Sequence, residues 1–340
     1  MKNNIFTKNL SKAKKENRRL IAPLLGAPGL NFTGTTMKLA QQNYHEHFKI
    51  LKAISNVFSP DIIFPLMDLS VEANAIGCYT LFPQEDSATV MKEDFDDVKI
   101  SKLEKVNIAH DTRLLGYVET VKTMELGLPP NIMRGAFVAG PYSLSALMIG
   151  AEEAAMATMV DEEYLERICE IATKRIQQYI HLLISAGVNI VCILEPTGVL
   201  LGPNQFQQFS AKFVKFITES LKYTDVTTMY HVCGNTMPLV DAMGQTGVDI
   251  LSLDSAEVGV DLPAVVKHIP EEMTILGNIN PTGTILTGTP NEVKKETASL
   301  LESMNVVPNF VLSTGCDLPQ DTPIENIKAF MEAGRNYKVK

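Results

Sequence analysis

Short runs of apolar residues recur along the chain, and a longer amphipathic stretch follows each run. The runs are rich in Ile, Val, Leu and Met, and each ends at Gly or at a residue with a polar side chain. Uninterrupted apolar character is typical of parallel strands that are covered on both faces. We therefore predict eight strands, at Leu20–Gly26, Ile62–Asp68, Met133–Gly140, Asn189–Glu195, Thr227–Cys233, Asp249–Asp254, Thr274–Asn280 and Phe310–Cys316.

The stretches between these runs carry helical patterns. The clearest covers Asp161–Ala186, where apolar residues recur at helical spacing and Gly187 marks the end. Eight strands that are each followed by a helix predict an α/β protein, a (β/α)8 TIM barrel. A doubly wound open sheet is the competing topology, and the lack of a Gly-rich dinucleotide fingerprint after any run disfavours it. Further helices are predicted at Asn204–Tyr223, Pro238–Thr246, Asn291–Asn305 and Thr322–Tyr337.

Length and composition predict a single domain over residues 1–340. A chain of 340 residues corresponds to roughly two average domains, but one α/β barrel reaches this size. No Gly/Ser-rich linker divides the sequence. Two segments depart from the repeating pattern. Residues 1–19 are a basic leading segment that we expect to form a solvated helical extension, and the charged Glu85–Asp111 is expected to be an excursion between strands two and three.

Composition excludes several classes of protein. Hydrophobic residues make up 45% of the chain, which excludes a disordered chain and a disulfide scaffold. The net charge of −9 repels phosphate backbones and excludes nucleic acid as a partner. No uncharged stretch reaches the ~20 apolar residues of a membrane span. Five widely spaced cysteines, an odd number, favour a reducing cytoplasm over a disulfide framework.

Polar side chains suited to metal binding or acid–base chemistry lie at the carboxyl ends of the predicted strands. In a barrel these ends meet on one face, where the active site is built, so we expect a functional site there. Its candidate residues are Asp68 after strand two, Glu195 after strand four, His231 and Cys233 after strand five, Asp254 after strand six, Asn278 and Asn280 after strand seven, and Cys316 after strand eight.

His231 and Cys233 form the most specific element of this set. Residues two apart on a strand project from the same face. The ends of strands five and eight both overlook the central opening, so Cys316 can reach the same ion. Two thiolates and an imidazole are a suitable ligand set for Zn²⁺. The alternative is that Cys233 packs as a small apolar residue beside a hydrogen-bonded His231. The other cysteines are expected in the core: Cys78, Cys169 and Cys192.

A tetrahedral zinc site needs a fourth ligand, or an open position for catalysis. Asp254 lies one βα unit after His231, and its carboxylate is one candidate for the fourth ligand. Glu195 is the other, and it has two further interpretations, as a helix cap or as a carboxylate that orients His231. A thiolate entering an open position would bring the site to a net charge of −1 and keep its own sulfur nucleophilic.

Taken together, these residues resemble the uroporphyrinogen decarboxylase-like superfamily. The chain is most similar to its zinc-dependent branch, the methylcobalamin:thiol methyltransferases of the coenzyme M type. The resemblance covers the chain from about residue 20 to residue 337, and the order His-x-Cys…Cys is specific to this branch. The matching motifs are Asp68-Leu-Ser-Val-Glu-Ala-Asn-Ala-Ile-Gly77, His231-Val-Cys-Gly-Asn-Thr236, Asp249-Ile-Leu-Ser-Leu-Asp254, Leu276-Gly-Asn-Ile-Asn-Pro281, Ser313-Thr-Gly-Cys316 and Thr322-Pro-Ile-Glu-Asn-Ile-Lys328.

The resemblance implies that His231, Cys233 and Cys316 hold a zinc ion. The family's fourth ligand is usually Glu at the position of Asp254. Asp is one methylene shorter than Glu, so Asp254 and Glu195 both stay open as the fourth ligand.

The implied reaction transfers a methyl group from a methylcobamide to a zinc-activated thiol. The chain has no Asp-x-His-x-x-Gly motif, which marks corrinoid carriers, so the methylcobamide is expected on a separate corrinoid protein. Asp68, Asn278 and Asn280 are expected to contact the cofactor. Coenzyme M, tetrahydrofolate and homocysteine stay open as the methyl acceptor. Monomer and homodimer stay open as the oligomeric state.

Three other functions stay open at this point. A zinc enzyme with the same ligand order transfers the methyl group from methyltetrahydrofolate to homocysteine, as cobalamin-independent methionine synthases do. A metal-free uroporphyrinogen decarboxylase is disfavoured, because Ile21–Gly26 stands where those enzymes carry an Arg-rich segment for porphyrin carboxylates, and the chain lacks Trp. The third is a non-catalytic scaffold that binds a corrinoid or a partner protein.

Overall fold

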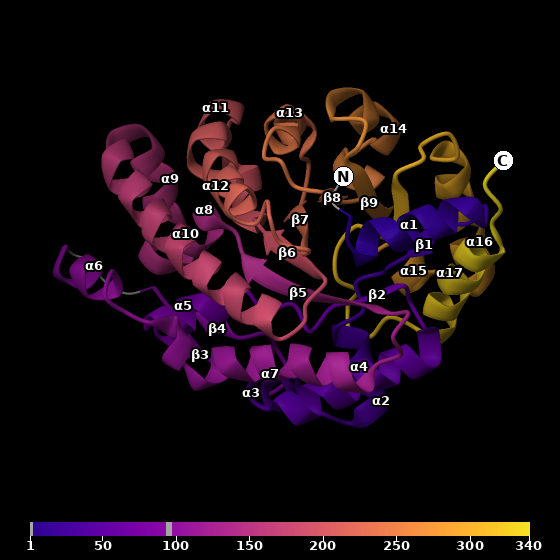
Figure 1. Cartoon of the computed structure of the whole chain (residues 1–340), viewed down its shortest axis with the longest axis horizontal. Helices are drawn as coiled ribbons and strands as arrows, with labels where there is room; N and C mark the ends of the chain where they lie inside the picture. The colour runs from indigo at the N-terminus through magenta and orange to yellow at the C-terminus, as the bar shows by residue number, and fades with distance from the viewer. Residues whose placement is uncertain (1–2, 93–96) are drawn as a thin grey trace.

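Eight parallel strands form a ring at the centre of the molecule (Figure 1). The structure is a computed structural model that describes residues 3–92 and 97–340. The strands are hydrogen-bonded in the order β1-β10-β9-β8-β7-β6-β5-β2, which confirms the predicted (β/α)8 barrel. The strands are β1 (Leu20–Ile21), β2 (Ile62–Ile63), β5 (Met133–Ala139), β6 (Ile190–Leu194), β7 (Thr227–Val232), β8 (Ile250–Leu253), β9 (Thr274–Ile279) and β10 (Phe310–Thr314).

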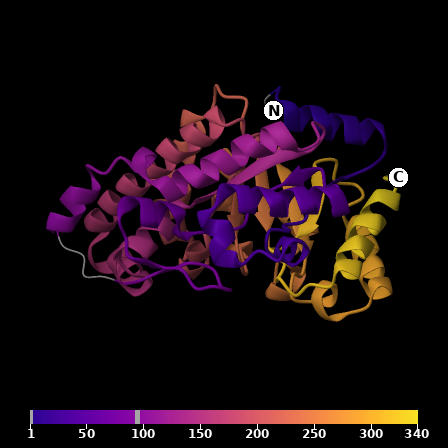
Figure 2. The ribbon, with the colours of Figure 1, turned by 90° about the horizontal axis from the view of Figure 1, so that it is seen from below.

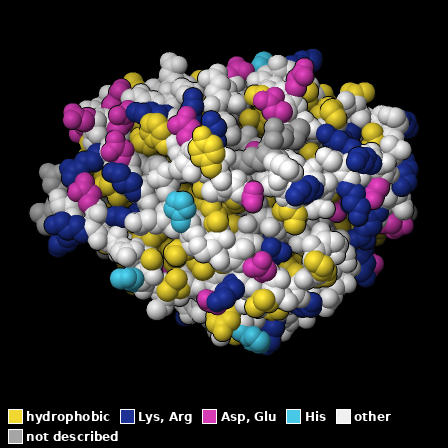
Figure 3. Space-filling view, viewed as in Figure 1, with side chains coloured by type: hydrophobic (Ala, Val, Ile, Leu, Met, Phe, Trp, Pro, Cys, Tyr) yellow, Lys and Arg dark blue, Asp and Glu magenta, His cyan; other side chains and the backbone are white. Residues whose placement is uncertain are grey.

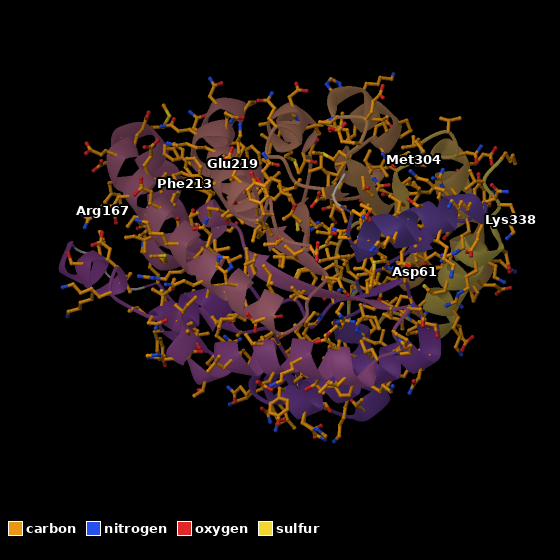
Figure 4. All side chains as sticks on the ribbon, in the orientation of Figure 1. Asp61, Arg167, Phe213, Glu219, Met304 and Lys338 are labelled. Atoms are coloured by element: carbon orange, nitrogen blue, oxygen red, sulfur yellow. The ribbon has the colours of Figure 1, made fainter. Side chains whose placement is uncertain are left out.

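Asp61 joins the two edges of the sheet, β1 and β2. Its backbone N–H donates to the carbonyl of Ile21 at 2.9 Å, and its carboxylate accepts from the backbone N–H of Ile21 at 2.8 Å. Arg18 donates to the same carboxylate at 3.2 Å. Asp61, labelled in Figure 4, thereby supplies partners to backbone groups that an open sheet edge leaves unpaired.

Helices surround the strands on the outside (Figure 1). The predicted helix at 161–186 is α10 (Glu162–Ser185), which begins where the Asp161 side chain accepts from the Tyr164 N–H and ends before Gly187. Within the described part of the chain, no helix is both long and apolar enough to cross a membrane. The other helices of the outer layer are α2 (Leu30–Thr33), α3 (Met37–Gln42), α4 (Tyr44–Phe58), α5 (Ser70–Ile76), α7 (Thr112–Gly127), α8 (Pro141–Ile149), α9 (Ala151–Val160), α11 (Pro203–Phe206), α12 (Lys212–Ser220), α13 (Val240–Gly244), α14 (Leu262–Val265), α15 (Thr284–Thr287), α16 (Pro290–Ser303) and α17 (Ile324–Asn336).

Apolar side chains fill both the inside of the barrel and the layer between strands and helices. Alternate residues of a strand point to opposite faces, so each strand supplies both clusters. Ile190, Cys192 and Leu194 of β6 lie in the inner cluster, whereas Val191 and Ile193 pack against the helices. Cys78 and Cys169 are buried as well, which confirms the predicted core positions of these cysteines and of Cys192.

The leading segment closes the amino-terminal end of the barrel. Its helix α1 (Ile5–Lys15) buries Phe6, Leu10 and Ala13 in the inner cluster of the barrel. Asn4, its N-cap, donates to the hydroxyl of Thr227 at the start of β7, at 2.8 Å. In Figure 2, α1 lies along the upper edge of the molecule, beside the N-terminus. The prediction of a solvated helix is therefore wrong for one face of α1. This face is apolar and buried, and the basic side chains lie on the rest of the helix.

The chain between β2 and β5 forms a two-stranded ribbon, which begins before the predicted excursion at Glu85–Asp111, and then two short helical segments. Ion pairs hold it against the main body. Lys92, after the ribbon, pairs with Glu153 of α9, and Glu104 pairs with Arg167 of α10, which Figure 4 labels, at 2.9 Å. Residues 93–96 of the predicted excursion lie outside the described residues. The segments are the antiparallel pair β3 (Thr80–Leu81) and β4 (Thr89–Val90), then α6 (Asp97–Leu103) and a helical turn at Ile108–His110.

A buried network of charged and polar groups ties α7 to the end of β2. Asp68 pairs with the guanidinium of Arg113 and accepts from the hydroxyls of Tyr117 at 2.7 Å and Ser70 at 2.6 Å. Glu72 lies beside this network, and its carboxylate accepts from a backbone N–H of β5 at 2.8 Å. Burial raises the pKa of Glu72 to about 8, and the nearby Asp68 charge adds to the rise.

We predict that Phe6→Ala lowers the free energy of unfolding by about 3–5 kcal/mol, because loss of the ring leaves a cavity inside the barrel. Urea denaturation measures this change. Lys12→Ala is the matched control on the solvated face of α1, where the Lys12 side chain is 69% exposed. Its effect should stay within about 0.5 kcal/mol. Equal stability of Phe6→Ala and wild type would show that α1 is not part of the barrel core.

Glu72→Gln should remove a pH dependence of stability. The folded state keeps the Glu72 carboxyl protonated up to about pH 8, whereas an unfolded chain releases this proton near its ordinary pKa of 4.5. The unfolded state therefore binds fewer protons between these values, and the contribution of Glu72 to stability falls as the pH rises. Between pH 5 and 8 the wild type should lose up to about 4 kcal/mol relative to Glu72→Gln in urea denaturation. Parallel pH profiles would contradict the buried, protonated carboxyl.

Candidate metal centre

Two thiols and one imidazole meet where β7 and β10 end, at the opening that we call the mouth of the barrel. His231 belongs to β7, Cys233 follows that strand directly, and Cys316 lies just beyond β10. Nε2 of His231 is 3.1 Å from Sγ of Cys233, and the Sγ atoms of Cys233 and Cys316 are 3.7 Å apart. One ligand atom from each residue lies within 4.8 Å of the other two. The structure thus brings together the three residues that the sequence analysis selected.

A tight turn directs Cys233 to this point. Gly234 has a φ of +82°, a conformation that strains residues with a Cβ atom. Its N–H donates to Oδ2 of Asp254 at 2.7 Å, and the N–H of Ser255 donates to Oδ1 at 2.6 Å. A Cβ on Gly315 would lie 2.8 Å from the Ser255 nitrogen, so glycine lets the exit of β10 approach this loop. Asp254 thereby fixes the turn beside Cys233.

His231 is held at both ring nitrogens. Its Nδ1 is 3.0 Å from the hydroxyl of Ser252, the residue of β8 that is paired with His231 in the sheet. This contact leaves Nε2 directed at the thiols. Burial acts to lower the pKa of His231, but a hydrogen bond and charge interaction with Cys316, together with the Asp254 charge, raise the pKa overall.

The two thiols differ in acidity. A hydrogen bond from Cys316 lowers the pKa of Cys233, against the opposing effect of burial. The same hydrogen bond, together with burial, raises the pKa of Cys316. Cys233 is therefore the first of the two to become a thiolate. Both side chains are partly exposed, so a small molecule at the mouth can reach them.

Glu195 lies outside the cluster and caps a helix. Its fully buried carboxylate accepts from the backbone N–H groups of Tyr142 and Ser143 at the N-terminus of α8, and from the hydroxyl of Ser210 at 2.8 Å. Negative charge is favoured at a helix N-terminus. The sequence left several interpretations open for Glu195, and the geometry matches the interpretation as a helix cap.

Asp254 lies beside the cluster but outside the ligand set. Within the described part of the chain, the group that fits a metal ion consists of His231, Cys233 and Cys316. Both oxygens of Asp254 already accept hydrogen bonds from backbone N–H groups. Both carboxylates that were predicted as a fourth ligand thus have hydrogen-bond partners within the protein, and their role as a metal ligand stays a prediction.

The three residues expected to contact the cofactor have partners within the protein. Asp68 is enclosed in the network at the end of β2. Asn278 donates to the carbonyl of Asp254 at 2.9 Å, and Asn280 accepts from the N–H of Thr282 at 3.0 Å. Asn278 thus helps to hold the Asp254 loop, and Asn280 shapes the turn after β9. Their contacts with a cofactor stay predictions.

The sequence analysis missed two groups near the mouth. Ser252 lies two residues before Asp254, and only the register of β7 and β8 shows that it faces His231. Arg113, which neutralises Asp68, comes from α7, 45 residues away in the chain. A hydrophobic pattern carries no signal for such a distant ion pair. The π-helical turn at Gln207–Ala211, which supplies Ser210 to Glu195, interrupts the helix predicted at 204–223 and was missed as well.

Known proteins with similar sequences include two kinds of enzyme. Methylcobamide:CoM methyltransferase MtbA from Methanosarcina mazei is 24% identical over 300 residues, which cover 85% of this chain and 84% of that protein. Uroporphyrinogen decarboxylase from Prochlorococcus marinus is 22% identical over 299 residues, which cover 85% of this chain and 81% of that protein. A solved structure described as a methyltransferase from Methanosarcina mazei has a TM-score of 0.86 at 21% identity and covers 98% of both chains.

The sequence profile of the uroporphyrinogen decarboxylase (URO-D) family matches residues 29–337. This span contains every strand of the barrel after β1, together with His231, Cys233 and Cys316. The chain belongs to the uroporphyrinogen decarboxylase (URO-D) family.

Proposed function

We propose that this protein is a zinc-dependent methyltransferase that moves a methyl group from a methylated corrinoid to a thiol such as coenzyme M. The observation that carries the proposal is the cluster of His231, Cys233 and Cys316 at the barrel mouth. Similarity to MtbA, a methylcobamide:CoM methyltransferase, supports the donor and the acceptor. The sequence lacks a corrinoid-carrier motif, so the methylcobamide arrives on a separate protein.

The geometry of the cluster fits zinc. A tetrahedral zinc ion with Zn–S bonds of about 2.3 Å holds two sulfur ligands about 3.8 Å apart. The Sγ atoms of Cys233 and Cys316 are 3.7 Å apart, close to that spacing. The Nε2 of His231 faces the same point from the third side. Two thiolates and a neutral imidazole balance the 2+ charge and are ligands that zinc prefers.

The fourth position is where the acceptor thiol would bind. When bound, zinc lowers the pKa of a coordinated thiol and keeps its sulfur nucleophilic at neutral pH. Asp254 keeps negative charge close to the site without occupying that position, because both of its oxygens are turned to backbone N–H groups. The inner cluster of the barrel, with Cys192 and Leu194, is apolar and is closed at the amino-terminal end by α1.

The framework of the site restricts motion of the ligands. Ser252 accepts from Nδ1–H of His231 when Nε2 is the ligand atom, which fixes the tautomer and the plane of the ring. Asp254 holds the turn at Gly234, and Asn278 holds the carbonyl of Asp254. The proposed chemistry depends on reduced thiols, which favours a cytoplasmic location. We also infer that residues 1–340 act as one domain.

Ser252→Ala should weaken zinc binding by about 10- to 100-fold, because His231 loses the hydrogen bond that orients it. Competition with a chelator of known affinity measures the change. Ser255→Ala is the matched control, since the buried Ser255 hydroxyl has no hydrogen-bond partner among the described residues, and this variant should bind zinc like the wild type. Equal zinc affinity of Ser252→Ala and wild type would contradict the positioning role of Ser252.

Cys316→Ser should lose both the metal and the activity. Wild-type protein purified under reducing conditions should hold about one zinc ion per chain and consume methylcobalamin when coenzyme M is added, because the three ligands complete one site. Metal analysis gives the zinc content, and the absorbance of the methyl–cobalt bond follows the transfer. A panel with homocysteine and tetrahydrofolate in place of coenzyme M identifies the acceptor.

Cys192→Ala is the control for this experiment, because it removes a thiol from the inner cluster of the barrel rather than from the ligand set. It should keep its zinc and its activity. Full retention of zinc by Cys316→Ser, or a wild type without zinc and without transfer to any acceptor, would overturn the proposed function.

A further inference from the structure

Exposed apolar side chains lie along one side of the mouth. Leu81 and Met91 come from the β3–β4 ribbon, Met156 and Met159 from α9, and Leu200 from the turn that follows β6. Their exposed fractions run from 39% for Met91 to 72% for Met159. We call these five residues the apolar rim. Large apolar side chains this exposed are costly in water, and several together mark an interaction surface.

The apolar rim is supported as one surface. Lys92, which follows Met91, pairs with Glu153, so the ribbon and α9 lie side by side. Glu153 lies three residues before Met156 and six residues before Met159 on α9. On the other side, the amide of Gln205 in α11 lies 3.5 Å from the sulfur of Met159. The turn that carries Leu200 belongs to the β6 exit, where Glu195 caps α8.

Acidic side chains surround the apolar rim. They lie on both of its elements, on the tip of the ribbon, on α9 and at the start of α10. In Figure 3, magenta groups lie at the upper left, over α9 and α10, with dark blue groups between them. A partner that complements this surface presents an apolar centre with Lys or Arg around it. The acidic residues are Glu85, Asp86, Glu152, Asp161, Glu162 and Glu163.

We propose that the apolar rim is the docking surface for the corrinoid carrier, a protein that presents its cobamide within an apolar face ringed by basic residues. This inference rests on the proposed function. The bulky donor must approach the thiols of Cys233 and Cys316, and α1 closes the other end of the barrel. A carrier that binds over the mouth therefore contacts the residues along its edge, which include the apolar rim. Methionine is well suited to such an edge, because its flexible side chain adapts to different partner surfaces.

An exposed apolar residue outside the apolar rim provides a matched control. Leu126 is 82% exposed and lies at the end of α7 that points away from the mouth. Leu126→Glu adds the same kind of charge as Met156→Glu/Met159→Glu, but outside the apolar rim. All of these side chains are exposed on helices, so the variants should fold like the wild type, which circular dichroism checks.

The experiment measures binding and transfer separately. The probe is the corrinoid-bearing protein fraction of the source organism, isolated by its visible absorbance and methylated before use. Sedimentation followed at the corrinoid absorbance detects only the carrier and its complexes. We expect Met156→Glu/Met159→Glu to weaken binding at least tenfold and Leu126→Glu to bind like the wild type. Binding of the wild type should also weaken as salt rises, because the ring of charges is solvated. With free methylcobalamin as donor, both variants should transfer at the wild-type rate.

Each outcome bears on the docking surface. Equal binding of the carrier by wild type and Met156→Glu/Met159→Glu would overturn it. So would a wild-type homodimer that the same double variant dissociates, because the apolar rim would then be a self-association surface. Loss of transfer from free methylcobalamin in every protein, with carrier binding still dependent on Met156 and Met159, would sink the proposed function and leave the docking surface supported.

Discussion

Parallel pairing of the strands is the constraint on which the rest of the site depends. Because all eight strands run in the same direction, their carboxyl ends open on one face of the barrel. Cys233 and Cys316, which are 83 residues apart, meet there within 3.7 Å. The register of β7 and β8 sets His231 opposite Ser252. A slip of one residue would turn the imidazole to the other face of the sheet, away from both thiols.

The carboxylates around the mouth have a different role from the thiols and the imidazole. The thiols and the imidazole of the cluster lie at the opening, whereas the buried carboxylates stabilise the frame that holds these side chains. Asp254 accepts from two backbone N–H groups, Glu195 caps α8, and Asp68 pairs with Arg113. A carboxylate that left its backbone partners to bind an ion would strand buried donors, which costs more than one hydrogen bond contributes.

Apolar runs were enough to predict the strands, because a strand covered on both faces leaves a short continuous signal. All eight predicted runs contain a strand, and each run extends past the carboxyl end of its strand. The surroundings of the site were beyond this kind of inference. The contact of Ser252 with His231 follows only from the strand register, and the ion pair of Arg113 follows only from the path of α7. The many lysines of α1 predicted a solvated helix and masked the apolar face that the helix buries. These contacts join distant segments, and only packing reveals them.

The closed amino-terminal end of the barrel has a kinetic consequence. With α1 sealing that end, the small acceptor and the protein-borne donor of the proposed function would share a single entrance. A carrier seated over the mouth would cover the thiols, so the acceptor would have to enter before the carrier and the methylated product would have to leave after it. The proposed transfer would then follow a compulsory order, and an excess of demethylated carrier would slow turnover by blocking the exit.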